Sequence, residues 1–285
     1  NYMNGALRSS KDARDYTLAD CLELDTSVSV PDKYLGMWLP DIRNQGETDS
    51  CTAYALSTIL SCINHKLYGR DITFSVGGIY GNRRIDNFQG KGRKMRDALK
   101  TVHKYGDYTA DEFECLSEVK DVITAFEKQY AANKETRHLV KSYVRIRKSE
   151  DAKIFLNKYN VPLFVCANMY NIIPLGGKGG HAMACYGYDG GRFYCQNSWG
   201  EKNYPNPWLE FKDFTEVWGC VPMENMKFTD VPNDKWSAQA ISEAANDGII
   251  EGFPDNTFRP NEPLTREQMA VIWRRIKHYV GDMND

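Results

Sequence analysis

The stretch "IRNQGETDSCTAYALSTIL", residues 42–60, places a Gln-Gly pair six residues ahead of Cys51. Apolar residues then recur with a 3.6-residue period from Ser50 to Tyr68 and stop at Gly69, which predicts a helix with Cys51 in its first turn. The positive end of a helix dipole and its unpaired N–H groups favour a thiolate. Cys51 is therefore either a buried packing residue or a nucleophile, and only a nearby base would make it a catalyst.

The composition of the 285 residues excludes several classes of protein. With 36 Lys and Arg against 38 Asp and Glu, the net charge is −2, so nucleic acid is not expected as a partner. The longest apolar stretch, "VPLFVCANMYNIIPL" from Val161, is too short and too polar to span a membrane. The eight cysteines form no C-x-x-C pair, so no metal site is expected. The seven besides Cys51 are expected to be buried free thiols.

The order of predicted elements indicates an α+β fold in which a helical half precedes a β half. Helices are predicted at 95–105 and 116–130, and strands follow after about residue 141. Residues 1–40 form either an extended lead-in or a short prosegment, and 41–224 form the main domain. Residues 225–285 form a separate small unit with two helices, the second of which begins with a capping box of Thr265 and Gln268.

The histidine best placed to act as a base is His181, at the start of the predicted strand "HAMACYGY". If the following turn is a three-residue loop over 189–191, facing residues of the hairpin have numbers that sum to 380. His181 and Asn197 then lie on one face of the ladder, one diagonal step apart. The Asn197 amide can hold one ring nitrogen and leave the other for a thiol, as in a catalytic triad.

The segments "NQGETDSCTAYA", "GGHAMACYGY" and "QNSWG" resemble, in chain order, three signature blocks of the papain family of cysteine peptidases. The resemblance implies a two-lobed fold with a helical lobe and an antiparallel β lobe, and it implies no cofactor. It also implies Cys51 as nucleophile, His181 as general base and then acid, and Asn197 as the residue that orients His181. The remaining roles it implies are an oxyanion-hole donor, Gln45, and two supporting residues, Trp199 and Ser198.

Four residues are expected to contact a polypeptide substrate: Asp49, Gly90, Gly92 and Gly180. Asp49 stands where the family commonly has glycine, and its charge opposes thiolate formation or favours a basic group in the substrate. The "GKG" of Gly90 to Gly92 is either a plain loop or a backbone partner for an extended peptide. Gly180 directly precedes His181.

The segment "FTDV…W…AI…GIIEGFPDNTFRPNEPLTREQMA" resembles one S-layer homology repeat. Such repeats imply attachment to the secondary polysaccharide of a Gram-positive-type cell wall, and hence an extracytoplasmic location at the cell surface or after secretion. The positions implied for wall binding are Trp236, Gly252, Asp255, Thr265 and Arg266. Wall binding commonly uses three repeats and this chain shows one, so a homo-oligomer and a mere packing module both stay open.

Together these patterns predict a cysteine-type endopeptidase that is targeted to the cell envelope. The alternative, from another class, is a catalytically silent or acyl-transferring protein of an envelope or virion, which uses the same fold for binding.

Overall fold

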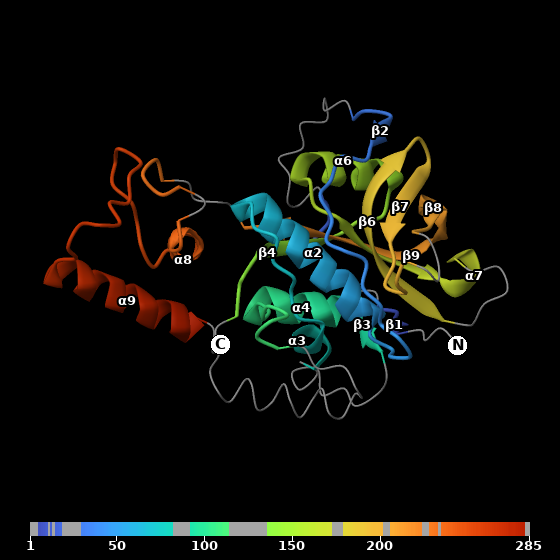
Figure 1. Ribbon diagram of the computed structural model, residues 1–285, viewed down its shortest axis with the longest axis horizontal. Helices are drawn as coiled ribbons and strands as arrows, with labels where there is room; N and C mark the ends of the chain where they lie inside the picture. Colours follow the sequence, from blue (N-terminus) through green and yellow to red (C-terminus); the bar gives the residue numbers. More distant parts are fainter. Residues whose placement is uncertain are drawn as a thin grey trace. The chain divides into compact units, whose positions relative to one another are not determined.

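The computed structural model describes residues 5–10, 12, 15–18, 30–81, 92–113, 136–172, 179–201, 206–223, 228–232 and 235–282. The chain divides into two compact units, the first made of residues 1–64 and 71–222 and the second of residues 65–70 and 223–285. The second unit thus takes in the last turn of a helix that begins in the first, a feature with no signal in the sequence. Figure 1 traces both units along the chain.

The helical lobe of the first unit contains α2 (Cys51–Tyr68), α3 (Val76–Gly81) and α4 (Met95–Tyr105). The predicted helices at 50–68 and 95–105 are confirmed, and the one at 116–130 lies outside the described residues. The apolar stripe of α2, which includes Leu56 and Ile59, is fully buried. Gly69 ends α2 with a φ of 65°, and its N–H donates to the His65 carbonyl at 2.8 Å. These contacts fix Cys51 at the start of a rigid element.

The strands of the described residues form one sheet in the order β3-β1-β6-β5-β9-β4, with β2 and β7 also pairing with β6, and β8 pairing with β7. Their bounds are β1 (Ala6–Leu7), β2 (Lys33–Tyr34), β3 (Arg93–Lys94), β4 (Val140–Arg145), β5 (Leu163–Asn168), β6 (Gly180–Asp189), β7 (Arg192–Gln196), β8 (Trp208–Glu210) and β9 (Phe214–Pro222). The short helices α7 (Met169–Ile172) and η1 (Phe211–Asp213) lie between strands. The sheet therefore joins strands from both ends of the main domain.

One helix missing from the sequence prediction, α6 (Ser149–Tyr159), packs against β5, β6 and β9. Its Phe155 ring lies so close to Gly219 that a Cβ there would come within 2.4 Å of it. The expected α+β class is confirmed, with α2, α3 and α4 grouped apart from the main strands (Figure 1). Among the described residues, no helix has the length and apolar character needed to cross a membrane.

The register of the β6–β7 hairpin differs from the prediction near its turn. Asp189 faces Arg192 and Tyr188 faces Phe193, so the loop has two residues and the numbers sum to 381. Gly190, at a φ of 58°, permits this tight turn. A bulge between Cys185 and Gly187 then adds one residue to β6, and beyond it the sum returns to 380. The two departures cancel, so His181 and Asn197 keep the predicted diagonal relation.

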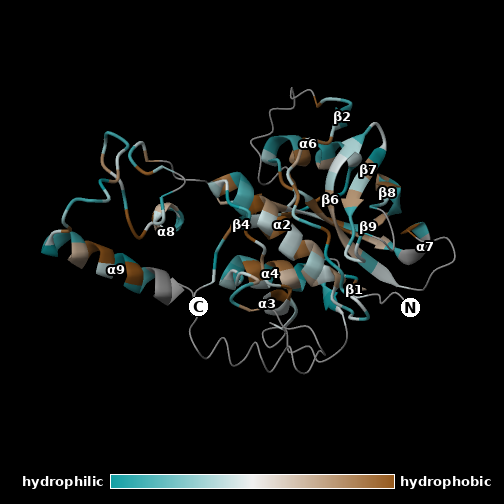
Figure 2. Cartoon of the chain, viewed as in Figure 1, coloured by the Kyte–Doolittle hydropathy of each residue, from teal (hydrophilic) through white to brown (hydrophobic). Residues whose placement is uncertain are grey.

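The second unit contains α8 (Ala238–Asn246) and α9 (Arg266–Asp282). The predicted capping box is confirmed: the Thr265 N–H donates to Gln268 Oε1 at 2.8 Å, and the Gln268 N–H donates to Thr265 Oγ1 at 3.1 Å. Figure 2 shows hydrophobic residues along α9, and several of them remain exposed, among them Met269, Val271 and Trp273. These three side chains of α9 are thus not buried within their own unit, whereas Ile272 and Ile276 are half-buried.

The cysteines largely follow the expectation of burial. Five of the seven besides Cys51 are described, and all are buried: Cys62, Cys166, Cys185, Cys195 and Cys220. Cys21 and Cys115 lie outside the described residues.

Candidate active site

Cys51 is the first residue of α2, and its side chain is 0% exposed. The Ala182 N–H donates to its Sγ at 3.5 Å, which places the thiol against the strand that carries His181. Burial raises the pKa of the Cys51 thiol, and the N–H groups of Ala182, Gly5 and Thr52 oppose this increase only in part. The sequence predicts a thiolate favoured by the helix N-terminus, but in this conformation burial prevails and the thiol is protonated.

His181 lies on β6 and is fully buried. Its Nε2 lies 2.8 Å from Asn197 Oδ1, which also accepts the Ser198 N–H at 2.8 Å. Because a carbonyl oxygen only accepts, Nε2 carries the ring proton and Nδ1 keeps its lone pair. Nδ1 is buried and has no hydrogen-bond partner among the described groups. Burial lowers the pKa of His181 to about 4, against the hydrogen bond to Asn197, which raises it.

Trp199 covers the His181 ring. The two rings are stacked, with centroids 4.3 Å apart and planes at 29°, and Trp199 is almost completely buried. The main chain of Trp199 also forms a bridge with Asn44 in the loop ahead of α2. The indole therefore keeps water from the side chains of His181 and Asn197.

Gln45 follows Asn44 in the loop ahead of α2 and is buried. Its Oε1 accepts a hydrogen bond from Ser198 Oγ at 2.6 Å, and its main-chain N–H donates to the Ser198 carbonyl at 2.8 Å. Its Nε2 donates to the Thr48 carbonyl at 2.7 Å. Ser198 thus orients the Gln45 side chain near the start of α2.

The strand β1 occupies the region where the glycine pattern predicts a bound peptide. Ala6 pairs in parallel with Arg93 of β3 and antiparallel with Gly180 of β6. The Arg93 N–H donates to the Gly5 carbonyl at 2.7 Å, and a Cβ on Gly92 would lie 2.5 Å from that carbonyl oxygen. Gly92 and Gly180 therefore contact an extended chain that belongs to this protein, while Gly90 lies outside the described residues.

The residues that follow β1 are fixed to the same unit. We name residues 5–10 the 5–10 segment. The Ser9 N–H donates to Glu216 Oε2 at 3.0 Å, and the Arg96 N–H donates to Ser9 Oγ at 3.2 Å. Farther along, Asp15 forms a buried ion pair with the Arg96 side chain. The predicted substrate residue Asp49 is also in contact, because a Cβ on Gly5 would lie 1.8 Å from the Asp49 carbonyl oxygen.

Glu216 is a buried carboxylate that the sequence analysis did not identify. It pairs with Arg145 at 2.9 Å, accepts the Trp218 Nε1–H at 2.7 Å and holds the Ser9 N–H. One signal for it was present, namely a single acidic residue inside the otherwise apolar run "FTEVWGCV". Among the described residues, no group of three or more His, Cys, Asp or Glu is arranged to hold a metal ion.

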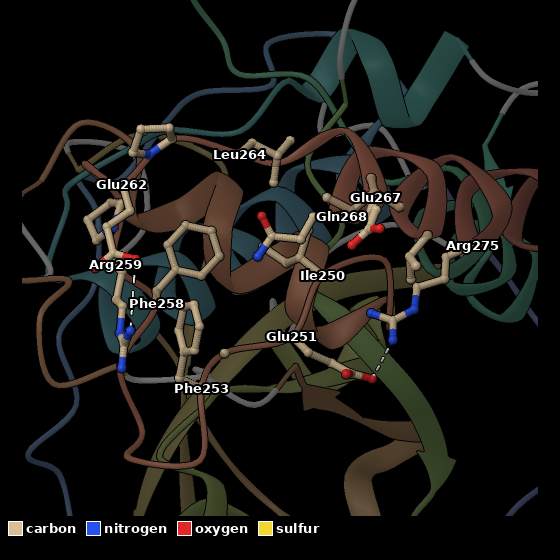
Figure 3. A pocket seen from close by; sticks show the side chains of 15 residues that line it. Ile250, Glu251, Phe253, Phe258, Arg259, Glu262, Leu264, Glu267, Gln268 and Arg275 are labelled. Atoms are coloured by element: carbon tan, nitrogen blue, oxygen red, sulfur yellow. Dashed lines mark ion pairs between the residues drawn. The ribbon is translucent and has the colours of Figure 1, made fainter.

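The second unit contains a pocket of about 550 Å³ between α9 and the connector, the residues 247–265 that join α8 to α9. Figure 3 shows Phe253, Phe258 and Arg259 at one end and Arg275 at the other. The Arg259 guanidinium lies 3.9 Å from the centre of the Phe253 ring, and Arg275 pairs with Glu251 at 2.9 Å. Aromatic faces and guanidinium groups together suit a sugar with an anionic substituent.

Of the five residues predicted for wall binding, only Gly252 lines this pocket. Trp236 is 87% exposed, and Arg266 is exposed at the start of α9. Asp255 shapes the connector by accepting hydrogen bonds from Thr257 and Arg259. Thr265 caps α9.

A residue that sequence reasoning missed, Asp230, holds the pocket loop. Its carboxylate accepts the N–H groups of Phe258 and Arg259 at 2.8 Å and 2.7 Å. These hydrogen bonds, the one from Phe258 foremost, lower its pKa.

Comparisons with known proteins agree with this division of the chain. Residues 227–270 match the family model of the S-layer homology domain. The outer membrane protein SlpA of Thermus thermophilus is 50% identical over 56 residues, which cover 20% of this chain and 6% of that protein. The S-layer protein EA1 of Bacillus anthracis is 34% identical over 64 residues, or 22% of this chain and 7% of that protein. The chain thus matches only a small part of the length of these relatives.

The structural comparisons cover about three quarters of the chain. Xylellain, a cysteine protease from Xylella fastidiosa, superposes with a TM-score of 0.58 at 20% identity, over 76% of this chain and 95% of that chain. ProCathepsin B S9 from Trypanosoma congolense gives a TM-score of 0.55 at 13% identity, over 78% of this chain and 87% of that chain. The predicted two-lobed fold of papain-like cysteine proteases is therefore confirmed.

Proposed function

We propose that this protein is a cysteine-type endopeptidase in which Cys51, His181 and Asn197 form the triad. The observation that carries the proposal is the Asn197–His181 hydrogen bond of 2.8 Å beneath Trp199, on the strand whose Ala182 N–H contacts the Cys51 thiol. The tautomer that this hydrogen bond requires leaves the Nδ1 lone pair free, and a ring nitrogen with a free lone pair is what a thiol needs as a base.

The reaction follows from these positions. His181 Nδ1 takes the Cys51 proton, and the thiolate attacks the carbonyl carbon of a peptide bond. The negative oxygen that develops accepts hydrogen bonds from the Gln45 side-chain amide and from the Cys51 N–H. His181 then protonates the leaving amine, and water releases the acyl group. No step requires a cofactor.

We further propose that the 5–10 segment blocks the site until it is displaced, which makes residues 1–40 in part a prosegment. In its presence the thiol is fully buried, and the shifted pKa values of Cys51 and His181 favour the uncharged pair. A substrate in extended form would use the same main-chain partners at Arg93 and Gly180. Departure of the segment would expose both groups to water. This would reduce the cost of burying the charged pair, the Cys51 thiolate and the His181 imidazolium.

Labelling with an epoxide-type thiol inhibitor tests the proposal. After limited proteolysis to remove the segment, Cys51 should react faster than the other seven cysteines, and casein should be cleaved. Asn197→Ala should slow both reactions, whereas Cys220→Ala, a change to a buried cysteine on β9, should leave them unchanged. Equal reactivity of Cys51 and the other cysteines in the opened protein would contradict the peptidase proposal.

The catalytically silent alternative is favoured by one observation, the complete burial of Cys51 and His181. It predicts no hydrolysis even after the segment has been removed. Acyl transfer, the other alternative, predicts that an added amine is joined to the acyl group in preference to water. Mass analysis of the products of one peptide substrate, with and without the amine, separates the three outcomes.

For the second unit we propose attachment to a cell-wall polysaccharide, which would hold the peptidase at the cell surface. The support is the match to the S-layer homology domain and the pocket with Phe253, Arg259 and Arg275. Sedimentation with purified wall should show about tenfold weaker binding for Arg275→Ala, because a charge-assisted hydrogen bond is lost. The exposed neighbour Arg274 provides the matched control as Arg274→Ala. Equal binding of both variants would exclude the pocket as the wall site.

A further inference from the structure

Two buried thiols face each other across the hairpin that carries His181 and Asn197. Cys185 of β6 is directly opposite Cys195 of β7, and both side chains are 0% exposed. The other described thiols have different neighbours: Cys166 faces Ala182 and Glu216, and Cys220 faces Tyr143. Among the paired strand positions, the contact of two cysteines is thus particular to this rung of the ladder.

The main-chain hydrogen bonds show which kind of rung this is. The Cys195 N–H donates to the carbonyl of Pro207, just ahead of β8, at 3.0 Å. The N–H and carbonyl of one strand residue point to the same side, so Cys195 turns its main chain away from β6. The pair is therefore of the non-hydrogen-bonded kind, in which side chains approach most closely; in a regular ladder the facing Cα atoms of such a pair lie about 4.5 Å apart. The bulge between Cys185 and Gly187 lies next to this rung.

This spacing lies inside the range of a disulfide. Bridged cysteines have Cα atoms about 4.4–6.8 Å apart, a range wide enough to include a regular pair of this kind and a small shift at the bulge. The thiols already interact: burial, and the neighbouring Cys185 thiol, raise the pKa of Cys195. A protonated, buried thiol reacts slowly, so oxidation would take place as the hairpin forms or when it opens.

We propose that Cys185 and Cys195 form a disulfide that links the two strands of the catalytic hairpin. The oxidant is a low-molecular-weight disulfide, RSSR, of the extracytoplasmic space. This location rests on the surface attachment proposed above. The geometric argument for the Cys185–Cys195 bond does not depend on that attachment. One cysteine thiolate attacks RSSR and releases RS⁻, which gives a mixed disulfide. The second cysteine attacks the protein sulfur of that bond and releases the second RS⁻. Two protein thiols are oxidised and one RSSR is reduced to two RSH.

The position of this bond relates it to the active site. Because side chains alternate along a strand, residues 181, 183 and 185 share one face with 195 and 197. The disulfide would thus lie on the face of the His181–Asn197 hydrogen bond and tie together the strands that carry the two residues. It closes the short loop 185–195 and should raise the melting temperature of the first unit by roughly 5–10 °C.

Thiol mapping of the full-length chain tests the proposal without any variant. The protein is refolded with glutathione disulfide and with dithiothreitol in parallel, unfolded, alkylated without reduction and digested. The expected result after oxidation is one peptide pair joined through Cys185 and Cys195, with the other described cysteines alkylated. Free Cys185 and Cys195 after oxidative refolding, or their pairing with other cysteines, would overturn the proposal.

Thermal melting gives an independent measurement. The oxidised wild type should melt above the reduced protein, Cys185→Ala should abolish that difference, and Cys220→Ala should keep it. An equal difference in Cys185→Ala would also refute the bond. Both measurements are independent of hydrolysis and of wall binding. Reduced Cys185 and Cys195 in protein isolated from the cell surface would overturn formation of the bond there, even if RSSR oxidises the pair in vitro.

Discussion

Replacement of Gly5 by alanine should open the active site. The new Cβ would lie 1.8 Å from the Asp49 carbonyl oxygen and 2.3 Å from its carbon. Both clashes are with main chain, so no rotation of a side chain relieves them. Gly5 belongs to the 5–10 segment and to none of the proposed catalytic residues, which means that the simplest relief is for the segment to leave its place.

The size of the effect follows from the overlap. Forcing an extra carbon into a packed site costs about 1–3 kcal/mol, and a rigid contact at this distance belongs at the upper end. Each 1.4 kcal/mol changes an equilibrium about tenfold, so about 3 kcal/mol raises the ratio of open to closed molecules by roughly 100-fold. Alanine has less conformational entropy than glycine in a displaced, unfolded segment, and this lowers the gain in the open state by less than about 1 kcal/mol. Cys51 should therefore react some 30- to 100-fold faster.

The assay is the rate at which an alkylating reagent modifies Cys51, followed by peptide mass mapping. Gly36→Ala is the matched control, since a Cβ at that position meets nothing within 4 Å. Melting curves check that both variants keep the folded main domain. A labelling rate for Gly5→Ala within twofold of that for Gly36→Ala would show that the 5–10 segment does not control access to the thiol.

Three further predictions concern stability. Because burial lowers the pKa of His181 from 6.5 to about 4, the folded state binds fewer protons than the unfolded state between these values. Acidification from pH 6.5 to pH 5 should thus lower the free energy of unfolding by up to about 1.4 kcal/mol per pH unit, and His181→Gln should flatten that slope in denaturant titrations. Glu216→Gln should cost about 3 kcal/mol in thermal unfolding, because it removes the charge that pairs with Arg145, while the exposed Glu210→Gln should change stability by less than about 0.5 kcal/mol. Thr265→Ala should cost the second unit about 1 kcal/mol through loss of the α9 cap, and Thr265→Ser should restore it, as read from helix melting by circular dichroism.

The parts of the fold that the sequence predicts are those with a strong local pattern. The stripe of α2 and the apolar runs of β6 and β7, separated by a glycine turn, needed no knowledge of the rest of the chain. By contrast, β1 has two residues and exists only because Arg93 and Gly180 lie on either side of it. The hairpin register was predicted one residue wrong at the turn, because the prediction treats the run Asp189-Gly190-Gly191 as a three-residue loop, although Gly-Gly alone is typical of a two-residue turn. The compensating bulge has no local signature.

The same division holds for the candidate site. His181, Asn197 and Gln45 lie in recognisable motifs, and their hydrogen bonds follow from short elements that carry them to one place. The contact of Ser9 with Glu216 joins residues 207 positions apart, and no local pattern encodes such a pair. The pocket of the second unit was missed for a related reason, since Arg259 and Phe258 are positioned by Asp230 some 28 residues earlier.

The position of β1 between β3 and β6 has a consequence for solubility. Adjacent strands lie about 4.8 Å apart, so the gap between β3 and β6 fits a single extended chain. With β1 in place, the main-chain groups that face the gap at Arg93 and Gly180 are paired. Without β1, the edges of β3 and β6 that face the gap would have unpaired N–H and C=O groups. Exposed edges recruit foreign strands and lead to aggregation. The form without β1 in the gap would therefore aggregate more readily. An extended substrate bound in the gap would pair with the same edges and reduce that aggregation.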